Sequence, residues 1–354
     1  MREKKYSSVR VLKGTVSFLI DRKALLTLIT LGLTAVLLFL FSTGVGQMYI
    51  SPWNVLKALT GAGSSFEETV IFSLRLPRIL TALFVGIALA VAGGILQGMI
   101  RNPLASPDII GLTNGASLAV VSFLAVFSDS DNSLTVSIGW LPAAAFLGAS
   151  ATAFIVYLLS WNNGMSPVRL VLIGIGISTL LQAGTTLMMI LGPIYRASQA
   201  NIWITGSVNG SKWMDVQILV PVVVVLVLAA ITQARNINVQ ELGEDAAASA
   251  GSRIQVQRMI MLLVSTALTG TAVAFAGGIG FVGLMAPHIA RRLVGGAYGA
   301  LLPVAAVTGA ILVLAADLIG RTLFAPLEIP AGVFTASIGA PYFIYLLYKT
   351  RNSQ

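Results

Sequence analysis

The side chains that could carry out acid–base, nucleophilic or metal chemistry are few. The 354 residues include one histidine, His288, thirteen Asp and Glu, and no cysteine. The HExxH zinc motif, the GxSxG nucleophile turn and the GxxxxGK(S/T) phosphate loop are all absent. For His288, at the end of an apolar stretch and three and four residues before Arg291 and Arg292, a structural role is favoured over a proton relay or a ligand. The sequence predicts no catalytic residue, no bound metal, no cofactor and no ATP-binding loop of its own.

One ionisable pair lies well inside an apolar stretch. Asp317 and Arg321 are four residues apart, which places both side chains on one face of a helix. Charges inside a membrane are costly and mark candidate functional sites, but the favoured interpretation is a neutralised pair that holds two helices in register. A transporter driven by protons or sodium usually needs more buried carboxylates, so we expect the energy source to lie outside this chain.

A polar segment, 234–257, separates two apolar stretches and could form a handle for another protein. Acidic residues precede a run of alanines and a closing glycine, a pattern that predicts a short helix lying on the membrane face. An ordinary connecting helix fits the same pattern. The candidate contact residues are Glu241, Leu242, Gly243, Glu244, Asp245, Ala246, Ala247 and Gly251.

Two arginines, Arg75 and Arg78, surround a proline that suits the first turn of a helix. They lie on the side of the membrane that carries few basic residues in the topology derived below. Fixed arginines there could bind the carboxylates of a partner through bidentate contacts. Snorkelling of both side chains to lipid headgroups is the alternative.

The composition requires membrane helices to position these residues. Hydrophobic residues make up 56% of the chain and charged residues only 10%, with a mean hydropathy of +0.89. Soluble domains carry about 25% charged residues, so a soluble enzyme, a disordered protein and a DNA-binding domain are excluded. Ten apolar stretches approach the length of about 20 residues that a span needs. They are 24–46, 77–100, 108–127, 138–160, 167–191, 216–233, 257–277, 279–295, 300–320 and 331–348.

The basic residues predict the orientation of these spans. With ten spans both chain ends share one side, and that side holds sixteen flanking Lys and Arg against six on the other. The positive-inside rule then places both termini in the cytoplasm. The expected organisation is a cytoplasmic basic tail (1–23), an all-α polytopic domain of about ten helices (24–348) and a cytoplasmic tail (349–354). The net charge of +9 reflects this topology and not nucleic-acid binding.

Several motifs occur in a recognisable order from about residue 44 to residue 348. They are Arg75-Leu76-Pro77-Arg78, Gly93–Gly98, Arg101–Gly111 (RNPLASPDIIG), Gly280–Leu284 with Pro287-His288, Ala316–Leu318 with Arg321, Glu328–Val333 and Gly339–Pro341. In these motifs the chain resembles the permeases of iron-siderophore, haem and cobalamin ABC importers, the FecCD family. The RNPLAxP pattern and the final EIPAG…GAP pattern are specific to that family.

The resemblance implies a transporter subunit in the cell membrane and not an enzyme. Family members have ten helices, pair with a second permease subunit (the same or a related chain), bind two cytoplasmic ATPase subunits and receive ligand from an extracytoplasmic substrate-binding protein. The loop that matches Glu241 to Gly251 is the segment that couples to the ATPase. The positions that match Arg75, Arg78 and Arg321 meet acidic residues of the binding protein.

The expected function is therefore the translocation path for an iron-siderophore complex, with haem or cobalamin as alternative substrates. The competing class is a secondary transporter or channel that works without ATP. Co-purification of an ATPase subunit would discriminate between the two classes. The sequence is compatible with a homodimer and with a heterodimer of permeases.

Overall fold

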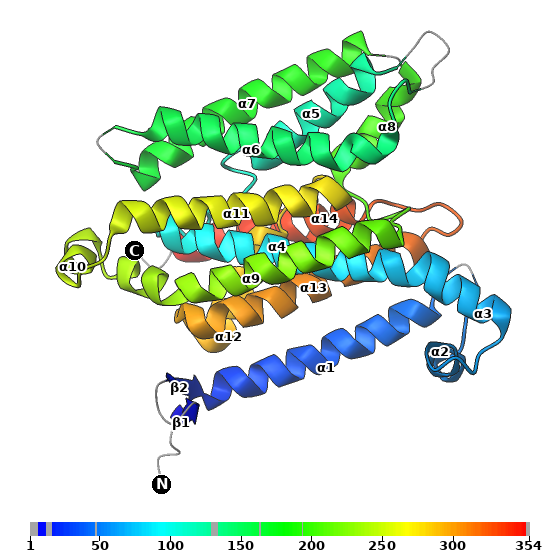
Figure 1. Ribbon diagram of the computed structural model, residues 1–354, viewed down its shortest axis with the longest axis horizontal. Coiled ribbons are helices and arrows are strands. Elements are labelled where there is room, and N and C mark those ends of the chain that lie inside the picture. Colours follow the sequence, from blue (N-terminus) through cyan, green and yellow to red (C-terminus); the bar gives the residue numbers. More distant parts are fainter. Residues whose placement is uncertain are drawn as a thin grey trace.

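The chain folds almost entirely into helices, as the computed structural model in Figure 1 shows. The structure describes residues 6–11, 16–46, 48–128, 134–162, 164–192 and 194–351. In chain order its elements are β1 (Tyr6–Val11), β2 (Val16–Asp21), α1 (Arg22–Gly44), α2 (Pro52–Leu59), α3 (Ser65–Thr69), the π-helical turn η2 (Val70–Arg75), α4 (Leu76–Ile100), α5 (Leu112–Val126), the 3-10 turn η3 (Ile138–Trp140), α6 (Leu141–Ser160), α7 (Pro167–Leu191), α8 (Ile194–Thr205), α9 (Trp213–Glu241), α10 (Glu244–Ser249), α11 (Ile254–Ala276), α12 (Val282–Val294), α13 (Tyr298–Thr322) and α14 (Ala331–Arg351).

The helices lie side by side in layers (Figure 1). One layer contains α5, α6, α7 and α8, and we call it the α5–α8 layer. The other, the α4 layer, contains α4, α9, α11 and α13, with α12 and α14 packed against it. The two layers meet where α11 packs against α6, and α1 packs against α13 on the outside of the α4 layer.

Burial separates the central helices from the outer ones. We compare the most apolar stretch of 18 residues in each long helical segment. Of these residues, 78% are buried in Ser65–Ile100 (α3, η2 and α4), 72% in α11 and 61% in α13, against 6% in α1 and 17% in α7. All five are apolar enough to cross a membrane. The open apolar side chains of α1 and α7 therefore present a surface that suits lipid or another membrane subunit.

Glycines allow the central helices to approach closely. A Cβ atom at Gly86 of α4 would overlap the carbonyl oxygen of Gly309 of α13, and a Cβ at Gly309 would overlap that of Gly86. A Cβ at Gly93 would likewise overlap the carbonyl oxygen of Gly283 on α12. Membrane helices gain dispersion contacts through such small-residue faces, because the lipid supplies no hydrophobic force that drives helices together.

The helical membrane class predicted from the sequence is confirmed, with a difference in helix length. Among the described residues, eight helices are long and apolar enough to cross a membrane, against the ten spans predicted. In the predicted spans 108–127 and 279–295 the helices are shorter, 15 residues in α5 and 13 in α12. Each begins after a residue with positive φ, Gly111 at 86° and Phe281 at 66°, so the chain turns there instead of continuing a helix.

The basic tail contains secondary structure that the sequence pattern did not predict. β1 and β2 pair as an antiparallel hairpin, with Tyr6 opposite Asp21 and Val11 opposite Val16. The Asp21 carboxylate accepts a hydrogen bond of 2.8 Å from the backbone N–H of Lys23, which caps the start of α1. The first helix therefore begins at the end of the hairpin.

Candidate functional site

Charged side chains gather at the two ends of the bundle. In Figure 1, α10 and the β1–β2 hairpin lie at one end, called here the α10 end, and α2 and α3 lie at the other, called the α3 end. Ion pairs form at both. At the α10 end they are Arg101–Glu244, Arg258–Glu244 and Arg291–Glu241; at the α3 end they are Arg78–Asp317, Arg78–Glu328 and Arg321–Asp317.

At the α3 end, Arg78 joins α4 to α13 and to the loop that follows α13. Its Nε and Nη2 each lie 2.9 Å from Asp317 Oδ1. Its Nη1 lies 2.7 Å from Glu328 Oε2 and donates to Asn209 Oδ1 at 3.3 Å. The Asp317 side chain is 2% exposed, Arg78 11% and Glu328 30%. Glu328 is thus the more open of the two carboxylates that bind Arg78.

The pair predicted from sequence spacing, Asp317 with Arg321, is present but is the weaker contact. Arg321 Nε lies 3.7 Å from Asp317 Oδ2, and neither atom makes a hydrogen bond. Arg321 Nη2 donates instead to the backbone and hydroxyl oxygens of Ser42 at the end of α1. The closer partner of Asp317 is Arg78 of α4, so the contact that joins Asp317 to a second helix comes from an arginine that spacing did not select.

Arg75 closes the end of α1. Its Nη1 donates to the carbonyl oxygens of Thr43 at 2.7 Å and Gly44 at 2.9 Å, and its Nη2 donates to that of Met48. Carbonyl groups in the last turn of a helix lack partners within the helix. The buried guanidinium supplies donors to them, so Arg75 fixes how α1 meets the start of α4.

The three arginines predicted to dock a binding protein therefore lie at one end of the bundle, but they make contacts inside the chain. Arg75 is 7% exposed and Arg321 is 6% exposed. Only Arg78 sits beside a carboxylate that is open to solvent, Glu328. Contact of Arg75 or Arg321 with a partner would require their present hydrogen bonds to be replaced.

At the α10 end, the short helix α10 is present where the sequence predicted one. Gly243 precedes it with a φ of 115° and Gly251 follows it with a φ of 79°, both values that favour glycine. Ala247 is its only buried side chain. Glu241 is the last residue of α9, so it lies before this helix. The remaining predicted contact residues are largely open to solvent: Leu242, Glu244, Asp245, Ala246 and Gly251.

Glu244, the first residue of α10, meets two arginines. Its Oε1 lies 2.7 Å from Arg258 Nη2 and 3.1 Å from Arg101 Nη2. Arg258 is 2% exposed, whereas the Glu244 side chain is 49% exposed. The hydrogen bond from Arg258 lowers the pKa of the Glu244 carboxyl from its ordinary value, and the charges of both arginines act in the same direction.

A second ion pair ties α9 to α12 near the same end. Arg291 Nη1 lies 3.3 Å from Glu241 Oε1, and its Nη2 donates to the Tyr298 hydroxyl at 2.7 Å. The Tyr298 backbone N–H donates to Asn238 Oδ1 at 2.9 Å. The last turn of α9, which precedes α10, is thus fixed to α12 and to the start of α13.

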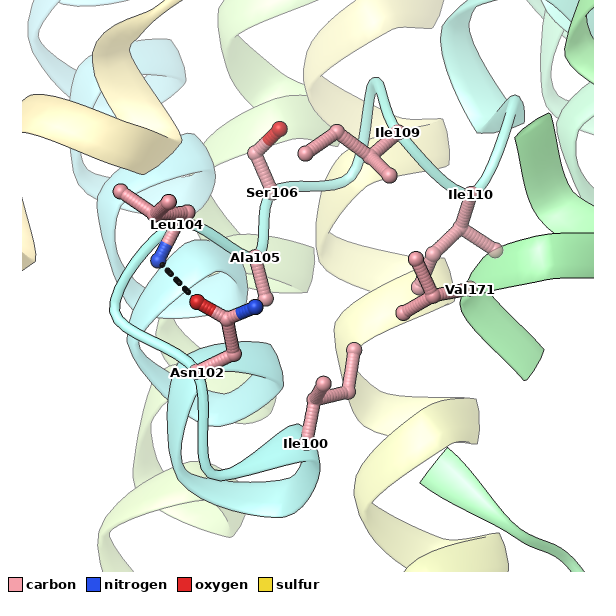
Figure 2. Close-up of a pocket in the computed structure, with 8 residues that line it drawn as sticks. All are labelled: Ile100, Asn102, Leu104, Ala105, Ser106, Ile109, Ile110 and Val171. Carbon is pink, nitrogen blue, oxygen red and sulfur yellow. Dashed lines mark hydrogen bonds between the residues drawn. The ribbon is translucent and has the colours of Figure 1, made fainter. Parts of the chain in front are cut away.

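A small cavity lies between the loop after α4 and helix α7. Figure 2 shows its lining and the hydrogen bond of 2.9 Å from the Leu104 N–H to Asn102 Oδ1. Its volume is about 40 Å³, which is room for a water-sized molecule and not for a metal chelate. The lining residues are Ile100, Asn102, Leu104, Ala105, Ser106, Ile109, Ile110 and Val171.

His288 packs edge-on against Tyr342 of α14, with 5.8 Å between the ring centroids. Both ring nitrogens and the Tyr342 hydroxyl are buried and make no hydrogen bond to the described residues. Among those same residues no group of three or more His, Cys, Asp or Glu could hold a metal ion. The contact between α12 and α14 agrees with the structural role that the sequence favoured for this histidine.

Sequence spacing missed the long-range partners in both clusters. Glu328 and Arg101 each lie in a motif that the sequence singled out, but spacing gave neither a partner. Arg78 meets Glu328 across 250 residues, and Arg101 meets Glu244 across 143. Helical periodicity relates only residues within a few turns, so it contains no signal for such pairs.

Comparisons with known proteins extend over most of the chain. Residues 33–349 match the FecCD transport family. The probable siderophore transport system permease protein YfhA of Bacillus subtilis (strain 168) is 63% identical over 94% of this chain and 97% of its own length. The achromobactin transport system permease protein CbrC of Dickeya dadantii (strain 3937) is 46% identical over 88% of each chain.

A solved structure supports the same relationship. A metal-chelate type ABC transporter in an inward-facing conformation superposes with a TM-score of 0.80 and 32% sequence identity. The superposition covers 91% of this chain and 98% of that one. The similarity therefore includes the arrangement of the helices and is not confined to a few motifs.

Proposed function

This chain belongs to the FecCD transport family, and from that premise we propose that it forms the membrane path for an iron-siderophore complex. It is a multi-pass membrane protein and a permease subunit of an ABC importer. The observation that supports the substrate class is the match of 63% over 94% of the chain to a probable siderophore permease. Haem and cobalamin are the alternative ligands.

The path lies between two permease subunits. A ferric siderophore is large and polar, so it needs a water-filled passage much wider than the cavity of about 40 Å³ beside α7. The open apolar faces of the outer helices leave room for a second subunit, identical or related. Two cytoplasmic ATPase subunits and an extracytoplasmic substrate-binding protein complete the importer.

The α10 end faces the cytoplasm, and both chain termini lie on that side. The support for this orientation is the excess of basic residues in the sequence flanks assigned to it. The α3 end, with its cluster of Arg78, Asp317 and Glu328, then faces the binding protein. Arg75 and Arg321 lie at the same end and donate hydrogen bonds to the last turn of α1.

Helix α10 and its flanks, from Glu241 to Gly251, form the contact with the ATPase. Support comes from its exposure, because only one of its side chains is buried. We expect Gly243→Trp to abolish co-purification of the ATPase or to uncouple hydrolysis from transport. The bulky side chain would keep this segment from fitting against the ATPase, and the φ of 115° is strained for any residue but glycine. The variant should still insert in the membrane. Normal transport by it would contradict the contact.

The function is tested by uptake into proteoliposomes that contain the permease and its ATPase. Radioactive iron bound to a siderophore is presented with the binding protein at the α3 end, and ATP is supplied at the α10 end. We expect uptake only when both are present. An ATPase variant that binds but does not hydrolyse ATP is the control. Uptake without ATP would refute the importer mechanism, and uptake of haem or cobalamin alone would refute the substrate class.

A further inference from the structure

Helix α10 is held in place by very few contacts of its own. It has six residues, and Ala247 alone is buried. A Cβ atom added at either of the two glycines beside it, Gly243 or Gly251, would meet no atom within 4 Å. Packing therefore constrains the helix weakly, and the ion pairs of Glu244 join the helix's own residues to the bundle. Its flanks are held separately, because Gln240 and Ser252 both donate to Gln257 Oε1 of α11.

The two partners of Glu244 lead to different parts of the molecule. Arg101 ends α4 in a left-handed conformation, with a φ of 56°, and begins the loop that runs to α5. Arg258 lies in α11, and its Nη1 donates to the carbonyl oxygen of Met165 at 2.9 Å. Met165 belongs to the loop between α6 and α7, and its N–H donates to Gln255 Oε1 at 2.9 Å.

Through these contacts one carboxylate reaches two loops of the α5–α8 layer, the loop by which the chain enters it and the loop that joins α6 to α7 within it. The loop after α4 leads into α5, and the loop that contains Met165 leads into α7. The cavity of Figure 2 lies between the first of these loops and Val171 of α7. Side chains leave only this small volume unfilled, because beside it Ile110 of the loop is fully buried and a Cβ atom added at Gly174 of α7 would lie 2.9 Å from the Ile110 Cα. The loop is therefore in close contact with α7, and a shift of the loop is passed to that helix.

We propose that Glu244 is the positioning residue that transmits a displacement of α10 to the α5–α8 layer, through Arg101 on one branch and Arg258 with Met165 on the other. The proposal rests on the proposed function, in which α10 contacts the ATPase. Glu244 does not touch the transported ligand. Through its ion pairs, Glu244 determines how a movement of α10 displaces the loops of the α5–α8 layer.

Spin labels test this connection directly, and the chain suits them because it contains no cysteine. One label replaces Ala248 on α10, and the second replaces either Pro103 in the loop after α4 or Asn162 in the loop before α7; all three positions are exposed. Distance distributions are measured by electron paramagnetic resonance on the purified full-length permease. No ATPase is needed, so this result does not depend on the proposed function.

We expect Glu244→Gln to broaden both distance distributions. Asp245→Asn is the matched control, because it removes a carboxylate from the next residue of the same turn, for which no ion pair is found in the described chain, and both distributions should stay narrow. Arg101→Gln should broaden only the distance from Ala248 to Pro103. It leaves Arg258 paired, so it also keeps the proposal testable if Glu244→Gln does not fold. Narrow distributions in Glu244→Gln, or in Arg101→Gln if that variant alone folds, would overturn the proposal.

Transport measurements separate this role from a merely structural one. In the complete importer, Glu244→Gln should lower the amount of substrate moved per ATP hydrolysed by at least about fivefold, the lower end of the usual coupling between sites. A structural role would reduce the yield and thermal stability of the complex and leave this ratio unchanged. An unchanged ratio would overturn the proposal even if ATPase binding to α10 were demonstrated.

Discussion

Buried charges at the α3 end are balanced residue by residue. Arg78 and Arg321 face Asp317 and Glu328, so this group of four is neutral. A buried ion is stable only when its desolvation is offset by partners. Arg75 is met differently, by carbonyl oxygens at the C-terminal end of α1. That end of a helix carries partial negative charge, which favours a cation there.

Removal of Asp317 tests this balance. Asp317→Ala leaves two arginines without their shared carboxylate and should lower the free energy of unfolding by about 3 kcal/mol, the size found when a buried pair is broken. The double variant with Arg78→Ala should recover more stability than that with Arg321→Ala, since Arg78 lies 2.9 Å and Arg321 3.7 Å from the carboxylate. Unfolding of the single and double variants in detergent measures the recovery for each pair. Equal recovery would show that Arg78 is not the main partner.

The lowered pKa of Glu244 predicts a pH dependence. A carboxyl whose folded pKa lies below its unfolded value of about 4.5 contributes stability that is fully present above that value. The contribution is lost as the pH falls through the folded pKa. The difference in melting temperature between the wild type and Glu244→Gln should therefore be constant above about pH 5.5 and shrink below about pH 4.5. High salt should also reduce this difference in melting temperature, because it screens the ion pairs. A difference that stays unchanged on acidification would contradict the ion pairs.

At the scale of elements, α4 has a special place. It is the most buried long helix, it meets α13, α12 and α11 along its length, and charged clusters lie at both of its ends. Its contact with α13 depends on two facing glycines, Gly86 and Gly309. Any side chain there separates the two backbones, so the contact specifies how these central helices cross.

Gly309→Ala should destabilise the bundle by about 1–3 kcal/mol, the usual cost of overpacking a closely packed site. Gly32→Ala is the matched control on α1, because a Cβ there meets no atom within 4 Å. It should leave stability unchanged or raise it slightly, since alanine favours the helix. Thermal unfolding of the two variants in the same detergent makes the comparison. Similar melting temperatures would mean that α4 and α13 do not depend on this close approach.

At the scale of the whole molecule, the two charged ends serve different partners in the proposed importer. Each end carries carboxylates that already bind arginines of the same chain. At the α3 end, acidic residues of a binding protein would have to compete with Glu328 for Arg78, whose Nη1 lies 2.7 Å from that carboxylate. Docking and the internal ion pair are then alternatives for one guanidinium group.

This competition predicts an increase in affinity. Glu328→Gln frees one side of Arg78 and should tighten binding of the substrate-binding protein about twofold to fivefold at low salt, the range for a partly exposed ion pair. Arg78→Gln should weaken it, and both effects should fade at high salt. Titration of the binding protein onto the permease in nanodiscs measures the affinities. If neither variant changes affinity at low salt, Arg78 does not dock the partner.

The sequence by itself determined the membrane class, the places of the long apolar helices and the short helix between α9 and α11. These are local properties: a span needs about twenty apolar residues in succession, and glycines end helices where the chain needs positive φ. Helix α7, for example, begins and ends where the apolar stretch 167–191 does. The expected partners came from the resemblance to the family, whose motifs occur in the same order along this chain.

Only the tertiary structure decided which helices are central and which charges meet. Windows in α1 and in Ser65–Ile100 share the same hydropathy of 2.5, yet 6% of one and 78% of the other are buried. Hydropathy measures preference for an apolar medium, and lipid and protein interior satisfy it equally. Spacing likewise selected Arg321 for Asp317, whereas Arg78, 239 residues away, lies closer. Periodicity describes one helix, and the choice between partners is made where different helices pack together.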